Sequence, residues 1–413
     1  MTVDKSSSVV PKLRFPEFQD APEWKTPRGD TLFNPINNRN AAPGLPVLAI
    51  TQEHGAIPRD QIDYHVSASE KSISSYKEVC KGDFIISLRS FQGGIEYSRY
   101  HGICSPAYVI LRRKVGDGSD HFFRHFFKSE RFIQQLTRNI EGIRDGKMIS
   151  FAQFSEQLLP TPKPPEQQKI ADCLGSLDDL IAAEDRKLEA LRQHKQGLMQ
   201  QLFPQPSETV PPLGVQSDWK TLSLPKVVFF QEGPGIMAAD FHSTGIPLVR
   251  LSGLAEKCVT LDGCNFLDPH KVAQKWAHFR LAVDDLVIST SASFGRVSIA
   301  TEAVAGAVFY TGLVRFRSTD KRLSNAYLKS FLESPNFLRQ VESYAVGGGI
   351  KHFGPTHLRQ MHIQLPPLFE QQRIADCLGS LDGLVSAMCR RLIFLRQHKQ
   401  GLMQRLFPSL EGE

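Results

Sequence analysis

Two short loops carry polar side chains of the kinds that recognise another molecule by hydrogen bonding. The first loop, residues 88–94 (LRSFQGG), follows the apolar segment DFIIS, and the second, residues 290–296 (TSASFGR), follows DLVIS. Arginine offers a planar fork of donors, and an amide or a hydroxyl offers both a donor and an acceptor. The strand-like segments match whereas the loop side chains differ, which is the pattern of one scaffold that recognises two different things. The candidate recognition residues are Arg89, Ser90, Gln92, Ser291, Ser293 and Arg296.

Glycine-flanked basic turns follow in both halves. The first, residues 142–147 (GIRDGK), contains Arg144 and Lys147, and the second, residues 347–352 (GGGIKH), contains Lys351 and His352. Because glycine lets the backbone approach a ligand closely, these basic side chains suit contacts with an anionic group.

Motifs for catalysis and for metal binding are missing from the sequence. Residues 142–147 differ from a phosphate-binding loop, because three residues separate the glycines and Met148 replaces the Ser or Thr that would hold Mg²⁺. Glu23-Trp24-Lys25 has the E-x-K spacing of some nucleases, but the second half repeats it as residues 218–220 (DWK), so a structural role explains it better. No H-E-x-x-H, C-x-x-C or Asn/Asp-Pro-Pro-Tyr sequence occurs. We predict no catalytic residue and no metal site.

A scaffold must position these loops, and the sequence contains one segment twice. Residues 166–204 and 370–408 align without a gap, and about three quarters of their positions are identical. Apolar residues recur at alternating steps of four and three, which predicts a long helix with an a/d heptad seam in each copy. The predicted seam residues are Ile170, Leu174, Leu177, Ile181, Leu188, Leu191, Ile374, Leu378, Leu381, Val385, Leu392 and Leu395.

The duplication of the helix favours one structural interpretation. A heptad seam alone also fits an ordinary core helix, but two copies separated by a whole domain can pair with each other antiparallel. A helix of about 38 residues spans about 57 Å, so the pair would be a spacer of fixed length. Leu180, Leu384 and Phe394 are apolar and lie outside the seam. They serve either docking of another protein or burial against the globular domains.

Outside the helices, each half alternates like a mainly β domain. Amphipathic helices are predicted near 121–136 and 324–341. We predict a mixed α/β (α+β) fold in which two mainly β domains alternate with two long, antiparallel helices, as a pseudo-two-fold repeat. The expected boundaries are a disordered lead-in at 1–10, the first domain at 11–163, the first helix at 164–204, the second domain at 205–365, the second helix at 366–408 and a tail at 409–413.

Length and composition indicate a soluble protein of two or three domains. The chain has 413 residues, of which 41% are hydrophobic and 22% charged, and no apolar run approaches a membrane span. The net charge of +6 is compatible with a phosphate backbone as partner but is not diagnostic. The seven cysteines include no C-x-x-C pair, so we expect reduced, mostly buried thiols of a cytoplasmic protein.

The doubled sequence P-P…E-Q-Q-x-I-A…L-R-Q-x-K-x-G-L-M-Q-x-L and the opening PKLRFPEF…WK resemble the specificity (S) subunit of type I restriction-modification systems. The resemblance covers nearly the whole chain. It implies that each globular part is a target recognition domain for one half of a bipartite, asymmetric site in double-stranded DNA. The paired helices would set the spacing and dock two adenine-N6 methyltransferase (modification) subunits, and through these two restriction subunits.

The resemblance also implies that this chain has no catalytic centre of its own. S-adenosylmethionine, ATP and Mg²⁺ would belong to the partner subunits of a site-specific deoxyribonuclease and methyltransferase that serves phage defence. The loop residues would then read base edges, because Arg bonds guanine and Gln bonds adenine through two hydrogen bonds. Lys147 and Lys351, with Arg144 and His352, would contact phosphates. Arg99, Arg112 and Arg113 add positive charge to the first domain.

Three alternatives remain at this point. The chain is the specificity component of a related type II system with fused nuclease-methyltransferase partners, or a scaffold whose coiled coil joins two protein-binding domains. An enzyme with a diverged active site is a third class, and the missing motifs argue against it.

Overall fold

In the computed structural model, the chain forms two compact units. The first comprises Met1–Asp185 with Arg390–Glu413, and the second comprises Arg186–Cys389. None of the helices among the described residues combines the length and the apolar character that crossing a membrane requires. The structure describes residues 8–62, 75–114, 116, 118–138, 149–203, 219–255, 257–290, 297–344 and 353–409.

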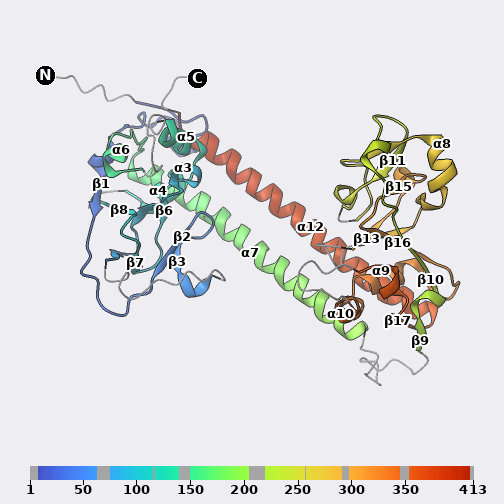
Figure 1. Cartoon of the computed structure of the whole chain (residues 1–413). Coiled ribbons are helices and arrows are strands. Elements are labelled where there is room, and N and C mark those ends of the chain that lie inside the picture. The colour runs from blue at the N-terminus through green and yellow to red at the C-terminus, as the bar shows by residue number, and fades with distance from the viewer. Residues whose placement is uncertain are drawn as a thin grey trace. The chain divides into compact units, whose positions relative to one another are not determined.

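A four-stranded antiparallel sheet forms the centre of the first domain (Figure 1). Ile85 and Ile110 face each other in register, and both are fully buried. A hairpin and a strand pair lie beside this sheet. The strand order is β1 (Phe33–Ile36), β8 (Val109–Arg113), β5 (Phe84–Ile86) and β6 (Glu96–Tyr97); the hairpin is β2 (Leu48–Thr51) with β3 (Gly55–Pro58), and the pair is β4 (Lys77–Val79) with β7 (Gly102–Cys104).

The second domain repeats this sheet with the same strand order. It also contains a three-stranded sheet, in which one pairing is parallel. The repeat confirms the predicted duplication of the mainly β domains. The main sheet is β10 (Val228–Glu232), β16 (Leu313–Ser318), β13 (Leu286–Ser289) and β14 (Val297–Ile299); the second sheet is β12 (Asn265–Leu267), β11 (Ile246–Val249) and β15 (Val308–Phe309); a further pair is β9 (Lys220–Ser223) with β17 (His362–Leu365).

A buried aspartate holds two strands of each main sheet together. Asp83 accepts two hydrogen bonds from the Arg112 guanidinium, at 2.7 and 2.8 Å, and Asp285 accepts two from Arg317 at the same distances. Such bidentate pairs fix geometry as well as adding energy. The aspartate shared by the two D-F-I-I-S-like segments is therefore part of the scaffold.

Two amphipathic helices were expected as single elements, and both are broken in two. α4 (Asp120–Phe126) and α5 (Glu130–Arg138) replace the helix expected at 121–136, and α9 (Asn325–Leu332) and α10 (Pro335–Tyr344) replace the one at 324–341. A serine hydroxyl caps the N-terminus of the second helix in each case: Phe132 N donates to Ser129 Oγ, and Phe337 N donates to Ser334 Oγ. Serine favours helix N-termini because its side chain satisfies a free backbone N–H there. Pro335 adds to the break, because proline cannot donate to the preceding turn.

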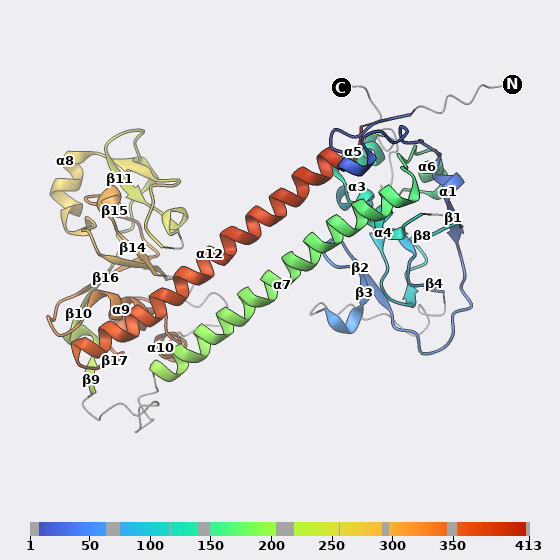
Figure 2. The same ribbon diagram turned by 180° about the vertical axis from the view of Figure 1, so that it is seen from behind.

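Two long helices, α7 (Pro164–Leu202) and α12 (Leu368–Leu406), have 39 residues each (Figures 1 and 2). In the first unit Lys399 pairs with Asp178 and Arg396 pairs with Asp185 at 2.8 Å. In the second unit Lys195 pairs with Asp382 at 2.5 Å, which is the repeat of the Asp178–Lys399 pair. The pairs Asp178–Lys399 and Asp185–Arg396 run in opposite directions along the two helices of the first unit. In the second unit Arg192 and Lys195 contact Cys389 and Asp382 in the same sense, which confirms the antiparallel pairing.

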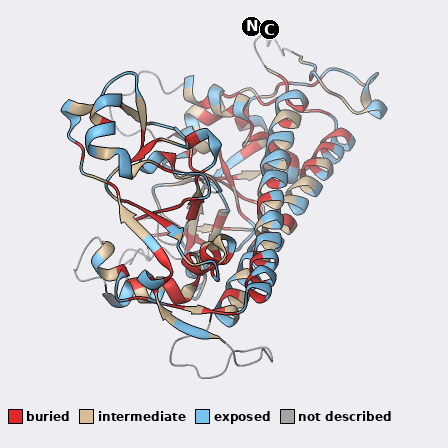
Figure 3. Ribbon diagram, turned by 90° about the vertical axis from the view of Figure 1, so that its right-hand side faces the viewer, coloured by how far each residue is buried: buried red, intermediate tan, exposed pale blue. Residues whose placement is uncertain are grey.

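The predicted seam residues are among the less exposed residues of these helices. Each of the twelve seam residues is buried or half-buried, whereas Leu180, Leu384 and Phe394 are exposed. In Figure 3 the long helices alternate between red and pale blue along their length, as expected for helices that bury one side. The seam of the sequence is therefore the buried side of the pair.

The cysteines are less buried than expected. All seven are free thiols, but Cys104 alone is buried and Cys377 is exposed. The two copies of the repeated helix cysteine lie beside the seam and not inside it, so helix packing leaves them partly accessible.

A buried glutamate of the repeated E-Q-Q sequence fastens each long helix to its domain. Trp24 Nε1 donates to Glu166 Oε1 at 3.2 Å, and Trp219 Nε1 donates to Glu370 Oε2 at 3.0 Å. In the first unit Arg14 adds an ion pair with Glu166 at 2.7 Å. The repeated tryptophan that follows Glu23 or Asp218 in the sequence thus has a structural role.

The next residue of the motif joins the helix to a loop of the domain. Gln371 Oε1 accepts from Ser324 N at 2.9 Å, and its amide nitrogen donates to Pro366 O at 2.8 Å. In the same way Gln167 Oε1 accepts from Ser119 N at 3.0 Å. Gln167 and Gln371 are both almost fully buried.

Replacing Gln371 by alanine is expected to lower the free energy of unfolding by about 2 kcal/mol, because buried backbone groups lose their partners. The neighbouring Gln372 is exposed, and its side chain donates to Asp376, one helical turn away. Gln372→Ala is the matched control and should cost less than about 0.5 kcal/mol. Thermal unfolding of the two variants compares them directly, and equal melting temperatures would contradict the assignment.

Candidate nucleic-acid interface

The first recognition loop forms one helical turn, α3 (Ser90–Gly93), which follows strand β5. Arg89 and Gln92 are exposed there, and neither side chain makes a hydrogen bond or ion pair with another described residue. Ser90 is only 1% exposed, and its hydroxyl accepts from Ser87 N at 2.8 Å. Ser90 therefore stabilises the turn. The turn exposes the side chains of Arg89 and Gln92 to solvent.

The other candidates cannot be placed in the same way. The second loop leaves strand β13 at Thr290, which is buried and donates from its backbone N–H to Gly312 O at 2.9 Å. Seven predicted residues lie outside the described residues: Arg144, Lys147, Ser291, Ser293, Arg296, Lys351 and His352.

A cleft of about 1080 Å³ lies within the first unit beside α3. The domain contributes the β2–β3 turn, α3, the loop after β6 and the helices α4 and α5, and the long helices contribute residues of α7 and α12. Most of the lining is polar. The lining includes the side chains of Gln52, Gln92, Arg99, Tyr100, Arg124 and Lys128.

Most cations of the cleft already have partners. Lys128 Nζ pairs with Glu96 and donates to Gly93 O at 2.9 Å. Burial raises the pKa of Glu96 and lowers the pKa of Lys128, and their ion pair opposes both shifts. Arg124 lies over the Tyr97 ring at 5.9 Å. These groups line the cleft.

Arg99 is a cation of the cleft that has no ion-pair partner among the described residues. Its side chain is exposed, and it makes no hydrogen bond or ion pair within the part of the chain that the structure describes. Arg112 and Arg113, the other arginines singled out from the sequence, pair with Asp83 and Asp120. His125 adds no charge at neutral pH, because burial lowers its pKa to about 3. Among the described residues that line the cleft, Arg99 is therefore a positive charge available to a ligand.

Sequence reasoning missed the β2–β3 hairpin turn as a part of the site. Gln52 in this turn donates to Arg89 O at 3.2 Å, so the turn packs against the recognition loop. A Cβ at Gly93 would lie 2.7 Å from the Gln52 side chain, so the turn and the recognition loop are in close contact. The signal in the sequence is T-Q-E-H-G between two apolar segments, in which Gly55 has a φ of 74°.

Comparison with known proteins supports one family. The profile of the type I restriction modification DNA specificity domain matches residues 33–193 and 271–392. The type I restriction enzyme MjaVIII specificity subunit of Methanocaldococcus jannaschii is 24% identical over 319 residues, which span 75% of this chain and 74% of that protein.

Two solved structures share the fold. A chain from a study of complex assembly and conformational transition of the type I R-M system has a TM-score of 0.61, with 18% identity over 93% of this chain and 97% of that chain. The type I restriction-modification S subunit from M. genitalium has a TM-score of 0.54, with 13% identity over 98% of this chain and 100% of that chain. Since the profile covers more than half of the residues, the chain belongs to the type I restriction-modification DNA specificity family.

Proposed function

We propose that the chain reads a bipartite DNA site for a type I restriction-modification complex. Residues 11–163 and 205–365 act as target recognition domains, and each reads one half of the site. The observation that carries this proposal is the same sheet built twice, with recognition loops that differ at equivalent places. One scaffold with two unlike loops suits two unlike half-sites.

The cleft of the first unit is the surface proposed to receive DNA. Arg99 neutralises a phosphate, which gives affinity without sequence preference. Arg89 and Gln92, which are exposed and unpaired among the described residues, contact base edges. Ser291, Ser293 and Arg296 have the corresponding role in the second half, and Arg144, Lys147, Lys351 and His352 contact phosphates.

The helix pair is proposed to act as a spacer and as a docking surface. A helix of 39 residues is about 58 Å long, which corresponds to about 17 base pairs at 3.4 Å each. Leu180, Leu384 and Phe394 have exposed fractions of 38%, 55% and 64%. Exposed apolar side chains on paired helices support docking of two adenine-methylating modification subunits, which carry S-adenosylmethionine and connect to two restriction subunits.

A methylation experiment tests this proposal. The chain is expressed with its modification subunit in a host that lacks adenine methylation, and the genome is sequenced with detection of modified bases. We expect one bipartite motif with methyladenine in both halves. A complex that forms but methylates no motif would overturn the proposal.

Replacing Arg99 by alanine is expected to weaken DNA binding of the assembled complex about three- to tenfold. The loss should be similar for all sequences at the first half-site, and the slope of log K against log salt should fall by about one, because one phosphate contact is lost. Arg39 is an exposed arginine of the same domain that does not line the cleft. Arg39→Ala is the control, and equal effects of the two variants would place DNA elsewhere.

A further inference from the structure

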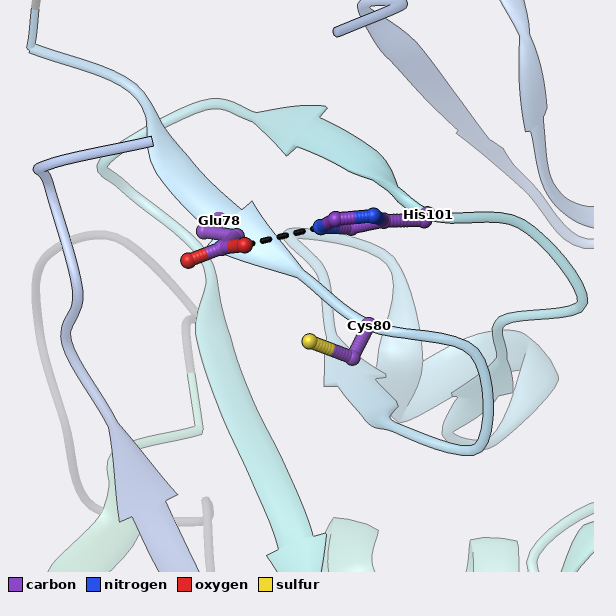
Figure 4. Close-up of side chains that lie close together, drawn as sticks. All are labelled: Glu78, Cys80 and His101. Atoms are coloured by element: carbon purple, nitrogen blue, oxygen red, sulfur yellow. Dashed lines mark hydrogen bonds and ion pairs between the residues drawn. The ribbon is translucent and has the colours of Figure 1, made fainter. Parts of the chain in front are cut away.

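Three potential metal ligands gather at one edge of the first domain. Glu78 lies in strand β4, Cys80 directly follows this strand, and His101 lies in the loop between β6 and β7 (Figure 4). One ligand atom of each lies within 4.8 Å of the other two. His101 Nε2 and Glu78 Oε1 are 2.7 Å apart. The sequence offered no sign of this group, because its members are not in a known metal motif.

The fold itself does not require these three residues. The second domain repeats the surrounding backbone: Cys80 N donates to Asp83 Oδ2 at 2.7 Å, and Ala282 N donates to Asp285 Oδ2 at 2.8 Å. The strand register repeats as well, since residue 78 faces residue 103 and residue 280 faces residue 308. By this register the equivalent residues are Arg280, Ala282 and Gly306, none of which is a metal ligand.

The chemistry of the group fits a zinc-type ion. Thiolate, imidazole and carboxylate together form a borderline-soft donor set, and three protein ligands leave a fourth position for water. Ligand atoms in tetrahedral zinc sites lie about 3.5 Å apart, so small side-chain movements complete the geometry. The His101 ring nitrogen Nε2 and one carboxylate oxygen of Glu78 are hydrogen-bonded. Asn38 bonds the other oxygen of Glu78, as outer-shell partners of metal ligands do.

The neighbouring charge is compatible with a cation. The Arg112 guanidinium lies near Cys80, but its two hydrogen bonds to Asp83 neutralise it. The group is also accessible, because the side chains of Glu78 and His101 are 20% and 50% exposed. A metal ion could therefore enter from solvent without displacing the core.

We infer that Glu78, Cys80 and His101 bind one Zn²⁺ that fixes the loop between β6 and β7. His101 directly follows Arg99 and Tyr100, which line the cleft. A metal at His101 would hold this loop to strand β4 and so reduce the freedom of Arg99. The effect on recognition rests on the proposed DNA-reading function, whereas metal binding itself does not.

Titration of the purified full chain with Co²⁺, a spectroscopic substitute for Zn²⁺, tests the binding. We expect about one equivalent bound, with a thiolate-to-cobalt absorption band that competes away with Zn²⁺. Cys80→Ser and His101→Asn should weaken binding at least tenfold, which is the loss that outer-shell changes already cause. Cys377→Ser, which alters an exposed thiol on α12, is the control and should keep the band.

A band that persists in Cys80→Ser, or a chain that takes up no stoichiometric Co²⁺, would overturn the metal site. The loop role is tested separately in the complex with its modification subunit. Zn²⁺ should tighten DNA binding by the wild type and leave His101→Asn unchanged. If Zn²⁺ binds and DNA affinity does not change, the loop role is wrong. If the wild-type complex binds no DNA at all, the proposed function is wrong, and the Co²⁺ titration alone decides whether the metal site exists.

Discussion

Replacing Asp285 by alanine is expected to lower the free energy of unfolding of the second domain by about 3–5 kcal/mol. Asp285 is 1% exposed, accepts a hydrogen bond from Arg317 at 2.7 Å and forms a longer ion pair with Arg315 at 3.6 Å. Arg315 itself is only 4% exposed. Without Asp285 it remains a buried cation whose acceptors are neutral oxygens, and a buried charge without a counter-ion is costly.

The first domain supplies the matched control for this prediction. Asp83 is equally buried and makes the same two hydrogen bonds, but its partner Arg112 is 43% exposed and can be hydrated. Ile110 stands in the first sheet where the second has Arg315, so no second cation is left behind. Asp83→Ala should therefore cost about 2 kcal/mol less than Asp285→Ala.

Native-state hydrogen exchange measures the two effects locally, because each domain has its own strands to report on. The amides of β13 and β16 should lose protection strongly in Asp285→Ala, and those of β5 and β8 should lose less in Asp83→Ala. Equal losses in the two domains would show that Arg315 is not the source of the cost.

The long helices and the duplication were predictable because their signals are local or repeated. A heptad seam fixes which side of a helix is buried, and two copies of the seam fix the partner. The breaks at Ser129 and Pro335 were missed for a different reason. Apolar residues continue through both breaks with nearly helical spacing. The first break depends on the Ser129 cap alone, and the second on the Ser334 cap together with Pro335.

The candidate site was predicted less completely, because availability of a side chain depends on partners distant in the sequence. Arg99, Arg112 and Arg113 looked alike as arginines of one region. Asp83, which lies 29 residues before Arg112, forms an ion pair with Arg112, and Asp120 forms one with Arg113. Composition cannot reveal which arginine stays free. The contribution of Gln52 likewise depends on a hairpin that packs on α3 only in the folded domain.

Lengthening both helices by one heptad is expected to abolish recognition of the original site and to create a longer one. Tandem duplication of Ile181–Lys187 in α7 and of Val385–Arg391 in α12 adds segments of equal length to both helices of the antiparallel pair. Seven residues add about 10 Å, or about three base pairs. The ion pairs Asp178–Lys399 and Lys195–Asp382 stay within their own units. The recognised motif should therefore keep both half-sites and gain about three base pairs between them.

The weaker affinity of this variant would itself be informative. Three base pairs turn one half-site by about 100° around the duplex, since one turn takes about 10 base pairs. Twisting or bending the DNA to compensate costs of order 1–6 kcal/mol. The control duplicates Ile181–Lys187 in α7 alone, which leaves α12 one heptad short and should destabilise the helix pair instead of moving the half-sites apart. Base-modification sequencing reads out the spacing directly. A doubly lengthened complex that methylates at the original spacing would show that the helices do not set it.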